Sequence, residues 1–439
     1  MGKIGFITPQ NNPDDQISFS REGQDLRKAA SLVQPYSSRG ANQWLGNFVE
    51  GARVIGIGEP THGTADCFKA QLTLAKQLIT DHNVRGVYAE IPSSSAVKAL
   101  VAAASGRDAV RAIIEATGHP SWMNDEILDL VMFIHQWNNE HPQQQVHFAG
   151  LDVHESHGAS MLEAITTAHP SIRQWARNVV SFRPPAPAPI SDFGLGVAVA
   201  PEATASLDIS SNDTLYSRAQ ELIDGGKRLR YLANAGSLQS DLMEGCLTWL
   251  SFVAEQLRAS SAGEPLAPTV RDTLMAASAE RCISRLGVDQ RAVVLGHNAH
   301  VAFGAPGDFA QGLGTALKQK LGSRYKAILT TTDGGFVTSH RAATSPSEVC
   351  SLTFPPRLSH ESAFRALSTE PFIFRVDQAM TDPMHEGLAR ESKPMRCMGY
   401  RYGPNVSDQF KSISLGEQCD GVVFFPQSRA SGFEQERLG

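Results

Sequence analysis

The feature that most constrains the fold of this chain is a regular alternation of short apolar runs with segments long enough for helices. Near-continuous apolar runs of about four to eight residues are typical of strands that are buried on both faces of a parallel sheet. Each run therefore predicts one such strand. The six runs are residues 53–57, 84–89, 146–151, 292–295, 325–329 and 421–425.

The segments between the runs predict helices that flank this sheet. Between the first two runs, apolar residues recur at helical spacing, at Phe68, Leu72, Ala75 and Ile79. A second helix is predicted to begin at Thr269 and to end at Gly287, just before another run. Strand–helix–strand units of this kind predict an α/β fold with a mostly parallel central sheet flanked by helices.

Changes in composition divide the chain into parts. The first 22 residues are polar and lack periodicity. Residues 182–190 are rich in proline and predict an extended connector, and residues 215–259 have leucines at helical spacing. We therefore expect an N-terminal arm (1–40), a helical insertion (155–265) and an α/β core formed by residues 41–154 and 266–439.

Charge and composition restrict the possible partners. The 39 basic and 45 acidic residues give a net charge of −6, which disfavours nucleic acid and anionic membranes as main partners. No apolar stretch approaches the ~18 residues of a membrane span, and the N-terminus does not resemble a signal peptide. The six cysteines are scattered, without a CxxC pair, as in reducing compartments. We expect a cytoplasmic protein, and the oligomeric state is left open.

Ionisable residues follow four of the predicted strands at the point where each strand ends. Because ligands of open α/β sheets bind beyond the carboxyl ends of parallel strands, we expect these side chains to converge. They are Glu59 and His62 after the first run, Glu90 after the second, Asp152 after the third, and His297 and His300 after residues 292–295. Histidine beside carboxylates is a combination suited to acid–base catalysis near neutral pH.

Each of these residues also has a simpler structural interpretation. Glu59 could cap the helix that begins near Thr64, because carboxylates favour helix N-termini. His62 could be an exposed loop side chain, and Asp152 could cap the segment that follows it. Glu90 would need a partner if it were buried at the end of an apolar run. The functional hypothesis therefore depends on the joint placement of these residues.

Better-known catalytic motifs do not account for this pattern. The chain has no G-x-S-x-G motif of a serine nucleophile. The Gly56-x-Gly58 segment has Thr61 where a dinucleotide-binding motif requires glycine. The segment from His154 to His157 reads HExH, not the HExxH of zinc peptidases, and we interpret it as the start of a helix or the wall of a crevice.

Taken in order along the chain, five motifs resemble the erythromycin esterase family. The resemblance extends from about residue 40 to the last predicted strand and implies an α/β core with helical additions. The motifs are Gly56-Ile57-Gly58-Glu59-Pro60-Thr61-His62-Gly63, then Glu90, Gly150-Leu151-Asp152, Val270-Arg271-Asp272-x-x-Met275 and His297-Asn298-Ala299-His300.

The resemblance implies that a small molecule, a macrolide, is the substrate and that activated water hydrolyses its lactone ester without a covalent intermediate or a cofactor. His62 is then the general base, and Glu59 and Glu90 support it or hold the water. His297 or His300 completes the site.

Three further residues are expected to contact the substrate. Arg271 could stabilise the oxyanion or protonate the leaving alkoxide, and Asp152 lies at the end of its strand. Members of the family often carry an arginine at the position of Gln71, so this chain departs from the family at a substrate or oxyanion contact. We expect the substrate to lie between the core and the helical insertion.

Three other functions are compatible with these residues. The histidines and carboxylates are a workable ligand set for zinc or manganese, so the protein could be a metal-dependent hydrolase. It could also be a non-catalytic binding protein, because fold does not determine function. Finally, the same base could promote cyclisation or elimination on a polyketide-like substrate.

Overall fold

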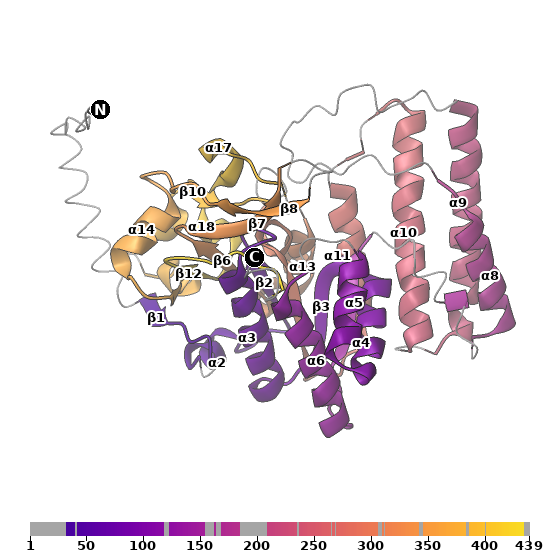
Figure 1. The fold of residues 1–439 in the computed structure, drawn as a ribbon, viewed down its shortest axis with the longest axis horizontal. Coiled ribbons are helices and arrows are strands. Elements are labelled where there is room, and N and C mark those ends of the chain that lie inside the picture. The colour runs from indigo at the N-terminus through magenta and orange to yellow at the C-terminus, as the bar shows by residue number, and fades with distance from the viewer. Residues whose placement is uncertain are drawn as a thin grey trace, which may run out of the picture.

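The computed structural model shows a central sheet with helices on both faces (Figure 1). Among the described residues, eight strands form this sheet in the order β1-β9-β12-β6-β2-β5-β3-β4. The fold is therefore the predicted α/β fold with a mostly parallel sheet. The structure describes residues 32–39, 42–117, 123–153, 162–163, 168–184, 209–234, 237–264, 266–267, 269–305, 310, 312–341, 346–382, 386–399 and 401–433.

Six neighbouring strands of the sheet are parallel, and they coincide with the six apolar runs. Because they are parallel, their carboxyl ends all lie at one edge of the sheet. The strands are β12 (Gly421–Phe425), β6 (Tyr325–Thr332), β2 (Val54–Glu59), β5 (Arg291–His297), β3 (Val84–Pro92) and β4 (His147–Asp152).

Two short antiparallel strands extend the sheet beyond β12. β9 (Phe372–Phe374) pairs with β12, and β1 (Val33–Pro35) pairs with β9. β1 lies within the segment that we expected to be an arm, residues 1–40. Its backbone groups find hydrogen-bond partners on β9, more than 330 residues away, and local polarity cannot reveal such partners. Residues 1–31 lie outside the described residues.

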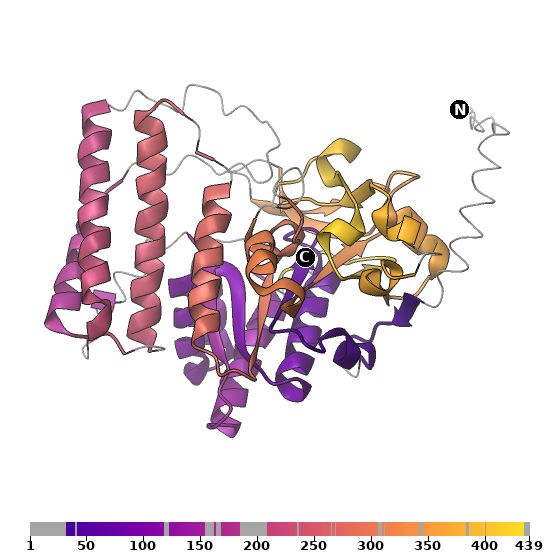
Figure 2. The ribbon, with the colours of Figure 1, turned by 180° about the vertical axis from the view of Figure 1, so that it is seen from behind.

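Successive residues of the parallel strands pack on opposite faces of the sheet. On β2, Ile55 and Ile57 belong to one apolar cluster and Val54 to the other. Because both faces are covered, the strands are continuously apolar rather than alternating. The first face is covered by α3 (Ala65–Asp81), α4 (Ser93–Ala102), α5 (Arg107–Thr117) and α6 (Asp125–Glu140), and the second by α11 (Thr269–Ser284) and α13 (Leu313–Leu321) (Figure 2).

Three helices of the predicted insertion stand beside the core instead of covering the sheet (Figures 1 and 2). They are α8 (Pro170–Ser181), α9 (Ile209–Leu229) and α10 (Leu238–Ser261). They share an apolar cluster that includes Trp175, Leu222 and Leu250, and Val97 of α4 joins it from the core. Residues 185–208 lie outside the described residues. None of the helices in the described part of the chain has the length and apolarity needed to cross a membrane.

Two small ribbons follow β6 and reach the carboxyl end of β2. β7 (Phe336–His340) pairs with β8 (Ser347–Ser351), and β10 (Lys393–Arg396) pairs with β11 (Phe410–Ile413). The backbone N–H of Thr338 donates to the carbonyl of Gly63 (3.0 Å), and that of Met398 donates to the carbonyl of Pro60 (2.8 Å). The ribbons therefore fix the turn that links β2 to α3.

The remaining helices are short and connect these elements. They are α2 (Trp44–Phe48), α12 (Asn298–Val301), α14 (His360–Leu367), α15 (Val376–Ala379), α16 (Glu386–Arg390), α17 (Val406–Gln409) and α18 (Leu415–Gln418).

Candidate active site

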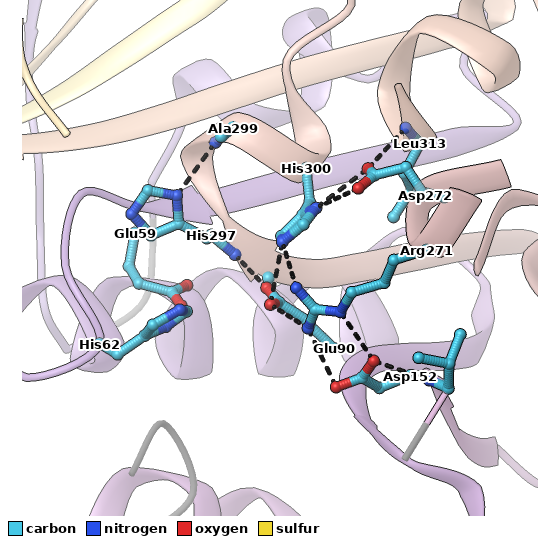
Figure 3. Close-up of polar contacts among 12 residues, drawn as sticks. Glu59, His62, Glu90, Asp152, Arg271, Asp272, His297, Ala299, His300 and Leu313 are labelled. Atoms are coloured by element: carbon cyan, nitrogen blue, oxygen red, sulfur yellow. Dashed lines mark hydrogen bonds and ion pairs between the residues drawn. The ribbon is translucent and has the colours of Figure 1, made fainter. Parts of the chain in front are cut away.

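The ionisable residues predicted to converge lie together at the carboxyl edge of the sheet (Figure 3). The parallel register places Glu59 of β2 directly beside His297 of β5. One turn later, the short helix α12 carries His300. The structure arranges these side chains in two contact groups, one around Glu59 and one around Glu90.

His62 and Glu59 form the centre of the first group. His62 Nδ1 lies 3.1 Å from Glu59 Oε1, and the His62 side chain is 7% exposed. Glu59 therefore contacts the histidine, and no side-chain hydrogen bond caps α3 at Thr64. The next residue of this turn, Gly63, packs directly against the β7–β8 ribbon. Only glycine fits at this position, because a Cβ atom on residue 63 would overlap the carbonyl of Thr338.

Gln71 of α3 holds Glu59 from within the protein. Its Nε2 donates to Glu59 Oε2 and lies 2.9 Å from the carbonyl of Ile57 and 3.1 Å from that of Gly296. Gln71 is buried. We expected it to contact the substrate, but its amide contacts Glu59 instead. Burial raises the pKa of the Glu59 carboxyl, and the hydrogen bonds from His62 and Gln71 oppose this rise.

Glu90 is the centre of the second group. Its Oε1 lies 2.9 Å from Arg271 Nη2 and 3.0 Å from His300 Nε2. Its Oε2 accepts the backbone N–H of His297 at 2.7 Å. Burial alone would raise the pKa of Glu90, but the positive charges of His300 and Arg271 hold it well below its usual range. Glu90 is therefore the ionised and fully partnered carboxylate that its buried position requires.

Arg271 joins Glu90 to Asp152. Its Nε and Nη2 donate to the two carboxylate oxygens of Asp152 at 2.9 and 3.0 Å. This fork matches the geometry of a carboxylate, which makes the pair rigid. Asp152 also accepts the backbone N–H of Val153 (2.7 Å), and the segment that it was expected to cap lies outside the described residues. With two carboxylates on its guanidinium, Arg271 serves first to organise this group.

The two histidines of the His-Asn-Ala-His segment differ in charge. His300 Nδ1 lies 3.0 Å from Asp272 Oδ1; burial opposes its protonation, yet Asp272 and Glu90 raise the pKa of His300 to about 10. Burial, reinforced by the nearby His62, holds the pKa of His297 well below its usual range. At neutral pH His300 is therefore a cation and His297 is neutral.

His297 is the histidine that lies against His62. The two ring centroids are 5.0 Å apart. His297 Nδ1 accepts the N–H of Ala299 (3.2 Å), and Nε2 lies 3.2 Å from the carbonyl of Met398, to which it donates. These bonds assign one tautomer and hold the ring against that of His62.

Asp272 is a member of the site to which the sequence analysis gave no role. It pairs with His300 and also accepts the backbone N–H of Leu313 at the start of α13 (2.9 Å). The one local sign of its role was that Asp272 directly follows Arg271. It was not enough because the partner of Asp272 is 28 residues away in the sequence.

The candidate metal ligands are not arranged as a metal centre. Among the described residues, no group of three or more histidine, cysteine, aspartate or glutamate side chains could hold a metal ion. The guanidinium of Arg271 occupies the space between Glu90 and Asp152 (Figure 3), where it would repel a cation. The residues from His154 to His157 lie outside the described residues.

Comparison with known proteins agrees with this fold. A succinoglycan biosynthesis protein is 14% identical, with a TM-score of 0.71 over 94% of this chain and 99% of that one. A Bacillus cereus protein is 17% identical, with a TM-score of 0.72 over 93% and 98%. A mutant of the erythromycin esterase EreC in its open conformation is 17% identical, with a TM-score of 0.61 over 89% and 94%.

A sequence profile of the erythromycin esterase family matches residues 82–428. The match contains Glu90, Asp152, Arg271, His297 and His300, and it begins after Glu59, His62 and Gln71. Because it covers well over half of the sequence, the chain belongs to the erythromycin esterase family.

Proposed function

We propose that this protein hydrolyses the lactone ester of a macrolide, using a water molecule activated by His62 and no covalent intermediate. The observation that carries the proposal is the 3.1 Å contact between His62 Nδ1 and Glu59. With Nδ1–H donated to Glu59, the imidazole is oriented to take a proton from water at Nε2. Glu59 stabilises the imidazolium that forms, as a carboxylate does for the histidine of a catalytic triad.

The reaction then proceeds in two proton transfers. As Nε2 removes a proton from water, the oxygen attacks the ester carbonyl carbon and the carbonyl electrons move to its oxygen. The tetrahedral intermediate collapses, the bond to the alkoxide breaks, and the alkoxide takes the proton back from His62. The lactone becomes an open hydroxy acid, and the imidazole returns to its neutral state.

The Glu90 group supplies fixed charge near this base. Arg271 and His300 are both positively charged beside the buried Glu90, and Glu90 also holds the backbone of His297, whose ring lies against His62. Charges already fixed in place need no reorganisation as the transition state forms, which is how a preorganised site lowers a barrier. In this proposal Gln71 positions Glu59, and Asp152 and Asp272 position Arg271 and His300.

Mass spectrometry of a panel of macrolides incubated with the protein tests the proposal. We expect the product to gain one water, and in ¹⁸O-labelled water the new carboxylate should carry the label. His62→Ala should slow product formation on the order of 10²–10⁴-fold, whereas His135→Ala, which changes a partly exposed histidine of α6, should not. A product without the label would indicate cyclisation or elimination, and undiminished turnover by His62→Ala would contradict the role of His62 as base.

A further inference from the structure

We propose that a cavity beside the His62 turn binds the apolar ring of the ester substrate, with Phe336 and Val349 as specificity-determining residues. This inference rests on the proposed function and places the non-reacting part of the substrate in this cavity, not between the core and the helical insertion as the sequence suggested, since no described residue of the insertion lines it. The cavity has a volume of about 470 Å³. Pockets for small molecules are typically about 300–1,000 Å³, so this one can hold a large part of a drug-sized molecule.

One wall of the cavity is the outer face of the β7–β8 ribbon. Phe336 and Val349 project from this face and are 52% and 63% exposed, although both are apolar. Val337 and Cys350 project from the opposite face and are buried in a small apolar cluster. The ribbon therefore carries apolar side chains on both faces: Val337 and Cys350 pack in the small cluster, and Phe336 and Val349 line the cavity. Exposed apolar side chains gathered in a hollow are typical of ligand sites.

The other wall is formed by Met123, at the start of α6, and by residues 429–432 near the C-terminus. Six of the eleven lining residues have polar or charged side chains, namely Thr338, His340, Ser347, Glu348, Arg429 and Ser431. A lining in which Phe336 and Val349 lie among several hydrogen-bonding side chains favours an occupant with a hydrocarbon frame that carries many oxygens. A macrocyclic ester has this chemistry.

Both walls are bonded to the residue that follows His62. The carbonyl of Gly63 accepts the backbone N–H of Thr338 from one wall (3.0 Å) and that of Ser431 from the other (2.8 Å). A molecule in the cavity therefore lies against segments that directly hold the turn of the proposed base. This continuity favours the substrate itself as the occupant, because binding energy from its remote part can orient the ester at the reacting centre.

The test compares Phe336→Ser with Phe354→Ser, a matched control. Phe354 is 86% exposed and is not among the residues that line the cavity. The probe is erythromycin, and its dissociation constant is measured by calorimetry with His62→Ala as the background, so that binding is observed without turnover. We expect Phe336→Ser to weaken binding on the order of tenfold, as for loss of an apolar contact in a pocket, and Phe354→Ser to leave it unchanged. Val349→Ser should repeat the effect of Phe336→Ser.

In the otherwise unchanged protein, Phe336→Ser should lower kcat/KM for erythromycin on the order of tenfold, because it removes binding energy that helps to orient the ester. Equal dissociation constants for the Phe336 and Phe354 variants would overturn the inference, and so would failure of erythromycin to bind. Hydrolysis of the macrolide panel is measured separately. If the parent protein forms ¹⁸O-labelled product but Phe336→Ser does not weaken erythromycin binding, only this inference is overturned. If the parent protein forms no labelled product from any macrolide, the proposed function is overturned.

Discussion

The Glu59 group and the Glu90 group lie at the same edge of the sheet but are held in different ways. His62 is buried, like Glu90 and His300 of the other group, and its Nδ1 contacts Glu59. Glu90 and His300 are buried between opposite charges, and their protonation states are fixed around neutral pH. A group that must gain and lose a proton needs a pKa near the working pH. A group that supplies a constant charge needs a pKa far from the working pH, so that its protonation state does not change. From this comparison we propose proton transfer for the first group and fixed charge for the second.

We expect the largest effect from a substitution that breaks the Glu90 group. Arg271→Met removes the shared partner of Glu90 and Asp152 and leaves two buried carboxylates without it. We expect a loss of about 3–5 kcal/mol in the free energy of unfolding and loss of activity, measured by urea denaturation and turnover. Arg258→Met, which breaks an exposed pair with Glu255, is the control and should leave the denaturation midpoint unchanged. If Arg271→Met also left the denaturation midpoint unchanged, the contacts of Arg271 with Glu90 and Asp152 would not stabilise the fold.

A change in the first group should affect activity and not stability. His62→Ala should lower kcat on the order of 10²–10⁴-fold, the contribution typical of a general base. Because the substitution leaves both apolar clusters of the sheet intact, the urea midpoint should stay close to that of the parent. If stability fell as much as in Arg271→Met, the distinction between the two groups would be lost.

Gln71→Leu sharpens the comparison within the first group. The leucine fills similar space but leaves Glu59 Oε2 and the Gly296 carbonyl without the amide donor. We expect a loss of about 1–3 kcal/mol in the free energy of unfolding, the cost of a buried polar group left unsatisfied. The acid limb of the kcat/KM profile should also shift to higher pH, because one of the groups that lower the pKa of Glu59 is gone. An unshifted profile would place Gln71 outside the positioning of Glu59.

The final expected effect is a dependence of stability on pH. The pKa of His300 is raised to about 10 in the folded protein, above the unfolded value of about 6.5. The folded state therefore binds more protons in this range. Its stabilising contribution is complete below about pH 6.5 and is lost as the pH rises toward 10. Urea denaturation at pH 6.5, 8 and 9.5 should show this decline, and His300→Gln should show a weaker one. An equal decline in both proteins would assign it to other groups.

Local sequence was sufficient to predict the six parallel strands of the sheet and the edge at which the ionisable residues gather, but not β1 and β9. The six apolar runs became the six parallel strands, and Glu59, Glu90, Asp152 and His297 stand at their ends. Periodicity also located α3 and α11. These features are predictable because burial on both faces of a strand, or on one face of a helix, leaves its mark on consecutive residues.

The partners of the site residues were not predictable in the same way. Arg271 meets Asp152 across 119 residues and Glu90 across 181, and no pattern within α11 shows that it does. Which of His297 and His300 is neutral also depends on Asp272, which comes from another element. The strand at Val33–Pro35 and the β7–β8 ribbon likewise take their places from distant backbone partners.

The amino-acid sequence alone determined the parallel α/β core, its family resemblance and the edge at which ionisable side chains gather. Only the tertiary structure decided which of them are charged, which are paired and which cavity adjoins the His62 turn. The physical reason is that strand and helix formation depends on nearest neighbours along the chain. Protonation depends instead on burial and on charges a few ångströms away, and folding brings those charges from distant parts of the sequence.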